Sequence, residues 1–331
     1  MTAVTPSASG RPWRRRSTWR NLMRDRPLYP LLALLVVMVA LVQLVQPGTV
    51  SPGWAAVNVR QAAVLAILAG CQTLTMLTGG IDLSVGYVAS MSGFVTATFV
   101  HQPGGWALGV AVALAAAALA GVVNGVGIGV FKVHPLIMTL GMGLIVYGLA
   151  NVWQLQSVQT GSGVPPVLRT LGVGMVADVV PYNLGVFVPL ALLIIVGLRR
   201  TGYGRMLYAI GDNPVAARLS GVRDWQVIVV LYVISALLAA IAGLLQSGLT
   251  NTASVTLVQT YVLPSVAATV IGGTSIMGGR GGYSGTIVGA LILTVLTGFL
   301  SILLPEPWRQ IVFGSIVVLV AAAYTRVTDA A

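Results

Sequence analysis

Asp82 is the one carboxylate within the apolar body of this chain, and such a charge costs about 2.5 to 3.5 kcal/mol at the centre of a bilayer. Two roles fit it. It can cap a helix starting at Leu83 by accepting amide hydrogens from Ser84 or Val85, which we favour, or it can take part in gating or passage. Other polar residues in apolar runs pose the same choice between bonding a neighbouring helix and contacting a solute. The candidates for a pathway or gate are Gln72, Asp82, Ser84, Asn124, Thr139, Thr274 and Ser275.

The chain shows no set of residues suited to catalysis. Its only histidines are His101 and His134, its only cysteine is Cys71, and its seven carboxylates are scattered, so no metal-ligand spacing is present. The only lysine, Lys132, does not follow glycines in the G-x-x-x-x-G-K-[ST] frame that cradles nucleotide phosphates. We therefore expect no catalytic residue, metal or cofactor on this chain.

A short segment between two long apolar runs carries the signals of an independent helix. Asn213 is a good N-cap, and Pro214 suits the first helical position, where no amide hydrogen is needed. Gly221 can take the left-handed conformation that closes a helix. Residues 214–220 are therefore predicted to form a two-turn helix.

The same segment, 200–224, is predicted to be a docking site for a soluble protein. Arginines outnumber Asp212 and Asp224 around it, and the small Ala216 and Ala217 would let a partner approach closely. An ordinary cytoplasmic loop would explain the arginines, but it would leave the cap, the proline and the glycine spacing without a role. The residues expected to contact the partner are Gly204, Arg205, Gly211, Asp212, Asn213, Pro214, Ala216, Ala217, Arg218 and Gly221.

Composition places the chain in a membrane. Hydrophobic residues make up 56% of it, charged residues only 8%, and the mean hydropathy is +0.92, whereas soluble domains carry about 25% charged residues. The net charge of +11 is distributed between the apolar runs and not over one folded basic face, which argues against nucleic acid as a partner. We expect an all-α polytopic protein in contact with lipid.

Apolar runs separated by glycine, proline and charge predict about ten transmembrane helices. Fifteen of the 18 basic residues fall on one side if both termini are cytoplasmic, because short cytoplasmic loops concentrate Lys and Arg. We expect a disordered basic arm over 1–27, one transmembrane domain over 28–326 and a tail over 327–331. The predicted spans are 28–46, 60–78, 84–100, 106–130, 136–155, 184–199, 225–247, 262–278, 284–304 and 309–326.

Glycines predict how the helices pack. Gly121, Gly125 and Gly129 recur every four residues, as do Gly281, Gly285 and Gly289, and such stripes permit close approach of helix backbones. Two glycine-rich inner turns, 79–86 and 271–282, each join a descending span to an ascending one. Five crossings on each side of the middle of the chain would suit two inverted halves, although no sequence repeat is visible.

Five motifs, in this order, resemble those of the permease subunit of ABC importers for monosaccharides such as ribose, xylose, arabinose and galactofuranose. They are TGGIDLSVG at 78–86, NG at 124–125, HPLIMTLG at 134–141, GRMLYAIGDNPVAARLSGV at 204–222 and IGGTSIMGGRGG at 271–282. The resemblance implies a bacterial inner-membrane protein that pairs with a second permease subunit, identical or related. It further implies a cytoplasmic ATPase that binds ATP and Mg²⁺ and grips 204–222, and an extracytoplasmic protein that delivers sugar. Replacing Gly211 or Ala217 with a bulky residue should then uncouple transport while the subunit stays folded.

One segment departs from the family pattern. Many such permeases have Glu-Leu-Asp-Ala-Ile-Ala-Ala before the second glycine-rich turn, where this chain reads YVLPSVAA at 261–268 and lacks both carboxylates. Ribose is therefore not singled out, and other sugars, polyols, autoinducer-like molecules or nucleosides remain open.

An ion-coupled secondary transporter would need more buried ionisable residues than Asp82. A receptor or assembly protein without transport is the other alternative.

Overall fold

The computed structural model describes residues 28–101, 104–157, 163–177, 179–305, 307–308, 311–312 and 314–315. The described chain is helical apart from a short antiparallel hairpin of β1 (Met175–Val176) and β2 (Val180–Pro181), which agrees with the predicted all-α class. The helices are α2 (Leu28–Val45), α3 (Pro52–Leu77), α4 (Val85–Thr98), α5 (Gly105–Gly129), α6 (Pro135–Ser157), α7 (Pro166–Val173), α8 (Leu184–Arg200), α9 (Gly202–Asp212), α10 (Pro214–Leu219), α11 (Asp224–Thr250), η2 (Gln259–Tyr261), α12 (Val262–Ile271) and α13 (Tyr283–Leu303).

Among the described residues, six helices are long and apolar enough to cross a membrane: α2, α3, α5, α6, α11 and α13. A seventh span results if α8 and α9, which meet at 69°, count as one broken span. About ten spans, inverted halves and cytoplasmic termini therefore remain predictions. The arm 1–27, the tail 327–331 and nearly all of the predicted span 309–326 lie outside the described residues.

Two predicted spans are shorter than expected. Helix α4 has 14 residues and is about 21 Å long at 1.5 Å per residue, less than the roughly 30 Å of a hydrocarbon core. The expectation of a continuous span over 262–278 is wrong, because α12 ends at Ile271. Beyond it, Gly273, Gly278 and Gly279 all have positive φ, which turns the chain out of the helix.

Helix α3 begins earlier than predicted. The Ser51 hydroxyl accepts a hydrogen bond from the Trp54 amide at 3.2 Å, and Pro52 takes the first helical position. The second half of the predicted outer loop 47–59 is therefore helical, and Arg60 lies inside a helix and is buried.

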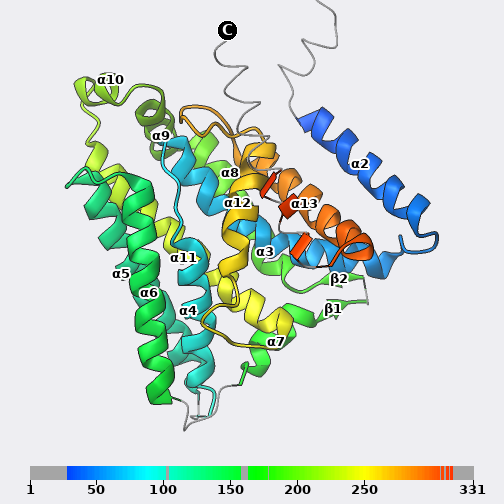
Figure 1. Cartoon of the computed structure of the whole chain (residues 1–331). Helices are drawn as coiled ribbons and strands as arrows, with labels where there is room; N and C mark the ends of the chain where they lie inside the picture. Colours follow the sequence, from blue (N-terminus) through cyan, green and yellow to red (C-terminus); the bar gives the residue numbers. More distant parts are fainter. Residues whose placement is uncertain are drawn as a thin grey trace, which may run out of the picture.

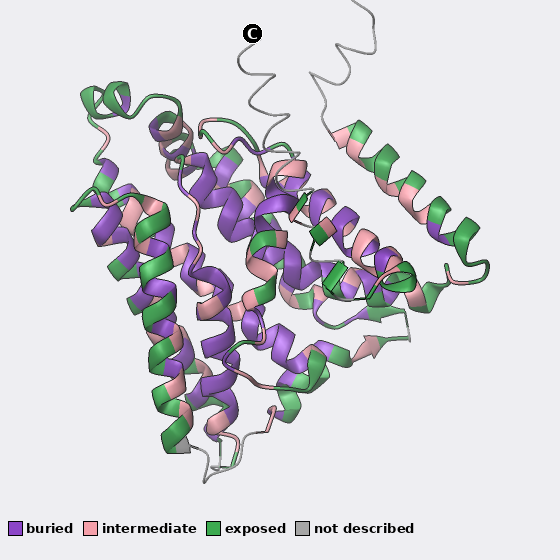
Figure 2. Cartoon of the chain, viewed as in Figure 1, coloured by how far each residue is buried: buried purple, intermediate pink, exposed green. Residues whose placement is uncertain are grey.

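The long helix α11 is the centre of the bundle. It packs against α3, α4, α5 and α7, and α3, α4 and α11 are largely buried, whereas α2 and α6 are mostly exposed at the periphery (Figure 2). A helix exposed all along an apolar face suits contact with lipid or with another subunit.

The glycine stripes act as predicted at most positions. A Cβ on Gly121 would lie 2.6 Å from the Tyr232 carbonyl oxygen, and one on Gly125 would lie 2.5 Å from Val229 Cα, so α5 needs glycine to approach α11. Gly285 and Gly289 of α13 contact the carbonyls of Gly272 and Ala268 equally closely. Gly281 is the exception, because it precedes α13 and belongs to the turn.

The two ends of the bundle differ. The short helix α10 projects beside α9 at one end, and α7 and the β1–β2 hairpin lie toward the other (Figure 1). Helix α11 starts five residues after α10 and packs against α7, so it connects the two ends.

Candidate functional site

The predicted docking segment forms the expected capped helix. The Asn213 side-chain oxygen accepts hydrogen bonds from the amides of Val215 and Ala216, both at 3.0 Å, and Pro214 is the first helical residue. Gly221 has φ +85°, and the chain closes with the Val222 amide donating to the Ala217 carbonyl at 3.1 Å. The helix ends at Leu219, one residue earlier than predicted.

An ion-pair cluster fixes α10 to the bundle. Asp224 Oδ2 lies 2.9 Å from Lys132 Nζ, between α5 and α6, and 3.1 Å from Arg218 Nη1 of α10. The Asp224 side chain is 12% exposed, whereas the two cations are about half exposed. One carboxylate thus joins three separate segments. The sequence predicts Arg218 as a partner contact and shows Lys132 and Asp224 only as charges, but it does not predict that the three meet.

The exposed face of α10 is apolar. Val215 is 56% exposed and Leu219 is 86% exposed, and Ala216 is exposed beside them. Ala217 is instead buried against the bundle, so the prediction that it faces a partner is wrong. Of the other predicted contact residues, Arg205, Asp212, Asn213, Pro214, Arg218 and Gly221 are exposed. Gly204 is buried against the carbonyl of Leu198, where α8 bends into α9.

Gly211, at the end of α9, lies against the end of α3, just before the first glycine-rich turn, and against the second glycine-rich turn. A Cβ there would overlap the Leu77 carbonyl at the end of α3 and the Gly279 amide. These two groups bond to each other, with the Gly279 amide donating to the Leu77 oxygen at 3.0 Å. A bulky residue at Gly211 must therefore displace backbone, and at Ala217 it must enter a buried space. We therefore expect either change to disturb the fold as well as the coupling, in contrast to the purely uncoupling effect expected from the sequence.

Five of the seven candidate pathway residues form one buried network around the non-helical segment 78–84. Asp82 Oδ1 accepts hydrogen bonds from the Ser84 amide at 3.0 Å and the Ser84 hydroxyl at 2.5 Å, and Asp82 Oδ2 accepts one from the Ser235 hydroxyl of α11 at 2.8 Å. The bond from the Ser84 amide agrees with the predicted capping role, although the helix starts at Val85 and not at Leu83. Ser235 was not predicted to belong to the site.

Two side chains make hydrogen bonds to backbone groups of this segment, which a helix or a sheet would otherwise provide. Gln72 donates to the Asp82 carbonyl at 2.7 Å and accepts from the Asp82 amide at 3.2 Å. Thr139 accepts from the Leu83 amide at 3.0 Å and donates to the Ile81 carbonyl at 3.2 Å. Non-helical backbone at membrane depth needs such internal partners.

Asn124 bonds a neighbouring helix element, as favoured from the sequence. Its side-chain nitrogen donates to the Ser84 hydroxyl at 3.0 Å, while its oxygen has no partner. Gln72, Asp82, Ser84, Asn124 and Thr139 are each at most 2% exposed. The network therefore holds the bundle together at this place and presents no open surface.

Thr274 and Ser275 lie apart from that network, in the second glycine-rich turn. The Ser275 hydroxyl accepts from the Met277 amide at 3.1 Å, and the Ser275 amide donates to the Arg280 carbonyl at 2.9 Å. Thr274 is fully buried, and its hydroxyl has no partner. These residues shape the turn that contacts Gly211.

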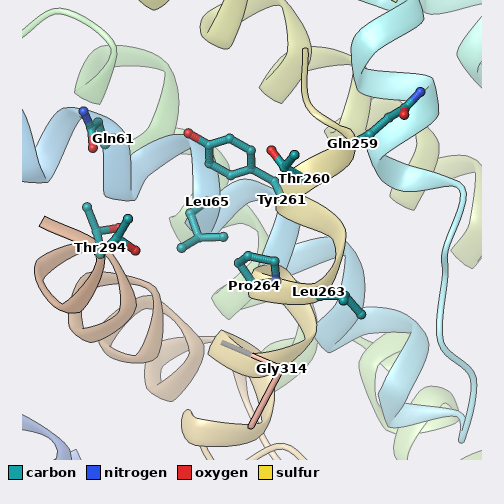
Figure 3. A pocket seen from close by; sticks show the side chains of 10 residues that line it. Gln61, Leu65, Gln259, Thr260, Tyr261, Leu263, Pro264, Thr294 and Gly314 are labelled. Carbon is teal, nitrogen blue, oxygen red and sulfur yellow. The ribbon is translucent and has the colours of Figure 1, made fainter. Parts of the chain in front are cut away.

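An open cavity of about 400 Å³, lined by both polar and apolar side chains, lies elsewhere, between α3, the η2–α12 junction and α13 (Figure 3). Part of its wall is formed by the segment 261–268, which departs from the family pattern, but no cavity was predicted there from the sequence. The run of polar residues 259–261 directly before an apolar helix was the available signal. The lining residues are Gln61, Leu65, Gln259, Thr260, Tyr261, Leu263, Pro264, Thr294, Thr297 and Gly314.

Comparison with protein families matches residues 56–321 to the family described as branched-chain amino acid transport system / permease component. The ribose import permease protein RbsC of Escherichia coli (strain K12) is 35% identical over 286 residues, which covers 82% of this chain and 87% of the relative. The fructose import permease protein FrcC of Rhizobium meliloti is 34% identical over 80% of this chain and 75% of the relative. The galactose/methyl galactoside import permease protein MglC of Salmonella typhimurium is 30% identical, with coverages of 79% and 83%. No solved structure gives a significant match.

Proposed function

Because this chain belongs to the family of transport-system permease components and is a multi-pass protein of the bacterial inner membrane, we propose that it forms the pathway of an ATP-driven sugar importer. It would pair with a second permease subunit, identical or related. A cytoplasmic ABC ATPase would bind and hydrolyse ATP with Mg²⁺, and an extracytoplasmic binding protein would deliver the solute. The relatives named for ribose, fructose and galactose support a sugar or a similar small polar solute.

The observation that carries this proposal is α10. It is a helix too short to persist alone, yet it is capped by Asn213 and tied by Arg218 to Asp224. Its outer face exposes Val215 and Leu219, which is unfavourable unless another surface covers them. A rigid, apolar, projecting helix is the kind of feature that a soluble subunit can grip.

Force on α10 would reach the spans by two routes. One route is the ion-pair cluster, because Asp224 is the first residue of α11 and also bonds Lys132 between α5 and α6. The other is Gly211, which contacts the end of α3 and the turn before α13. Closure of the ATPase subunits on ATP would then swing these helices as a body around the pathway.

The test places one charge on the exposed face of α10. Val215→Asp and Leu219→Asp should abolish co-purification of the coexpressed ATPase subunit and ATP-dependent sugar uptake, because a charge replaces an apolar contact. Val176→Asp is the matched control, since Val176 is 55% exposed in the hairpin against 56% for Val215. If the ATPase stays bound to the α10 variants, the assignment of α10 as its docking site is wrong.

The alternative function, an ion-coupled secondary transporter, can be tested with the membranes used for the uptake measurements. The Asp82 carboxylate already accepts three hydrogen bonds, from Ser84 and Ser235, which makes it a poor carrier for an exchanging ion. Uptake that survives ATP depletion and collapses with the ion gradient would contradict our proposal. A receptor without transport would bind no ATPase at all.

A further inference from the structure

The cavity between α3, η2–α12 and α13 retains unused hydrogen-bonding capacity. The Gln61 carboxamide and the Thr260 hydroxyl make no hydrogen bond to the part of the chain that the structure describes. The Tyr261 hydroxyl is approached only by the Gln246 side-chain nitrogen, at 3.5 Å, which is a weak contact. These three groups, on two walls of the cavity, are available to a ligand (Figure 3).

The α13 wall adds acceptors. The hydroxyls of Thr294 and Thr297 donate to carbonyls of their own helix, at 2.9 and 2.7 Å, which leaves oxygen lone pairs for an incoming donor. A ligand here meets donors and acceptors from amide and hydroxyl groups. A solute that both donates and accepts at several points, as a polyol does, matches that combination.

Apart from Gln259, the rest of the described wall is apolar, and none of the described residues that line the cavity is charged. Leu65, Leu263 and Pro264 offer carbon surface to the C–H face of a ring. A zwitterionic amino acid would bring two charges into this space without a counterion, which is strongly unfavourable. A volume of about 400 Å³ lies at the lower end of the range for small-molecule sites.

We propose that this cavity holds the transported solute during passage, and that it admits neutral polyhydroxylated rings and rejects zwitterionic amino acids. The proposal rests on the permease function argued above and names the class of solute. The relatives are named for sugars, whereas the family description names branched-chain amino acids, and the proposal chooses sugars over amino acids as the solute of this chain.

Protection of an introduced cysteine tests this directly. Cys71 is fully buried, so the unmodified chain should give little background with a water-soluble thiosulfonate. In the reconstituted transporter, Thr260→Cys should react, and at least one of D-ribose, D-fructose or D-galactose should slow the reaction several-fold. L-Leucine at equal concentration should not. Thr256→Cys is the matched control, because Thr256 is exposed in the same loop but does not line the cavity, and its rate should not change.

A cysteine on a second wall of the cavity shows whether the protection is more than a local effect at Thr260. Gln61→Cys on α3 should be protected by the same sugar that protects Thr260→Cys. The proposal is overturned if no sugar protects either position, or if leucine protects as well as the sugars do. ATP-dependent uptake of a sugar by the same proteoliposomes without protection would overturn the cavity assignment and leave the permease function intact. Absence of any ATP-dependent uptake would instead count against the permease function.

Discussion

Two groups of polar side chains lie within this bundle, one around Asp82 and one around Tyr261, and they use their hydrogen-bonding capacity in opposite ways. Around Asp82, nearly every donor and acceptor is engaged by the protein, and the residues are at most 2% exposed. Around Tyr261, the Gln61 amide and the Thr260 and Tyr261 hydroxyls face an open cavity and have one weak protein partner or none among the described residues.

This difference distinguishes polar residues that stabilise the fold from polar residues that can bind a solute. A polar residue in a membrane span is a functional candidate by default, but a network that satisfies itself has nothing left for a solute. The Asp82 network stabilises the segment 78–84, which is not helical and so lacks the backbone hydrogen bonds of a helix. The cavity, where Gln61, Thr260 and Tyr261 have no strong hydrogen-bond partner among the described residues, is the better candidate for passage.

The largest effect on stability is expected from Asp82→Leu. The change leaves the Ser84 amide and hydroxyl and the Ser235 hydroxyl without an acceptor in a buried site, at a cost of about 1 to 3 kcal/mol for each unsatisfied group. We expect little folded protein by size-exclusion chromatography in detergent. Asp82→Asn, which keeps an acceptor of the same shape, should remain folded.

This pair also tests whether Asp82 acts in transport. If the folded Asp82→Asn protein transports at a normal rate, the carboxylate charge serves no step of passage. A folded Asp82→Leu protein would contradict the structural role assigned to the network.

A smaller loss of stability is expected from Asp224→Asn than from Asp82→Leu. Lys132 and Arg218 are about half exposed, so solvent screens their attraction to Asp224, and the loss of stability should be about 1 kcal/mol or less. The local effect should be larger, because α10 loses its tie to α11. Trypsin should cut after Arg218 several-fold faster, whereas Asp212→Asn, which removes an exposed carboxylate of the same segment, should leave cleavage unchanged. Equal cleavage in both variants would show that the ion pairs do not hold α10.

Local features were the easiest to predict from the sequence. The cap at Asn213, the helix over 214–219 and the stripe at Gly121 and Gly125 depend on residues close in the chain, and the structure has all of them. The burial of Ala217 was not predictable in this way. It depends on which face of a two-turn helix meets the rest of the bundle.

Features made by distant segments escaped prediction. Gln72 and Thr139 were identified as polar residues in apolar runs, but nothing local shows that both bond the backbone of the segment 78–84. The cavity requires α3, α12 and α13 to converge, and α12 is shorter than the predicted span 262–278. The shortening follows from glycines with positive φ, whose conformation becomes known only in the fold.

A still smaller change in stability is expected from Asn124→Leu. Asn124 makes one bond, to a Ser84 hydroxyl that itself donates to Asp82, and its buried oxygen has no partner. Replacing the amide with an apolar group of similar size removes that unsatisfied oxygen, so the net change should stay within about 1 kcal/mol. Thermal unfolding in detergent measures it. Normal sugar uptake by this variant would support a structural role, whereas uptake lost from a stable protein would place Asn124 in the pathway.

The smallest effect on stability is expected from Tyr261→Phe, since the lost hydroxyl makes only the 3.5 Å contact with Gln246. Its effect on transport should be clear, because one solute hydrogen bond of about 1 kcal/mol corresponds to roughly a fivefold change in rate. Tyr232→Phe is the matched control, as Tyr232 on α11 is buried and its hydroxyl has no partner. ATP-dependent uptake should fall in Tyr261→Phe and stay normal in Tyr232→Phe. The reverse result would move the pathway from the cavity to the neighbourhood of Asp82, because Tyr232 contacts the Gly80 end of the segment 78–84.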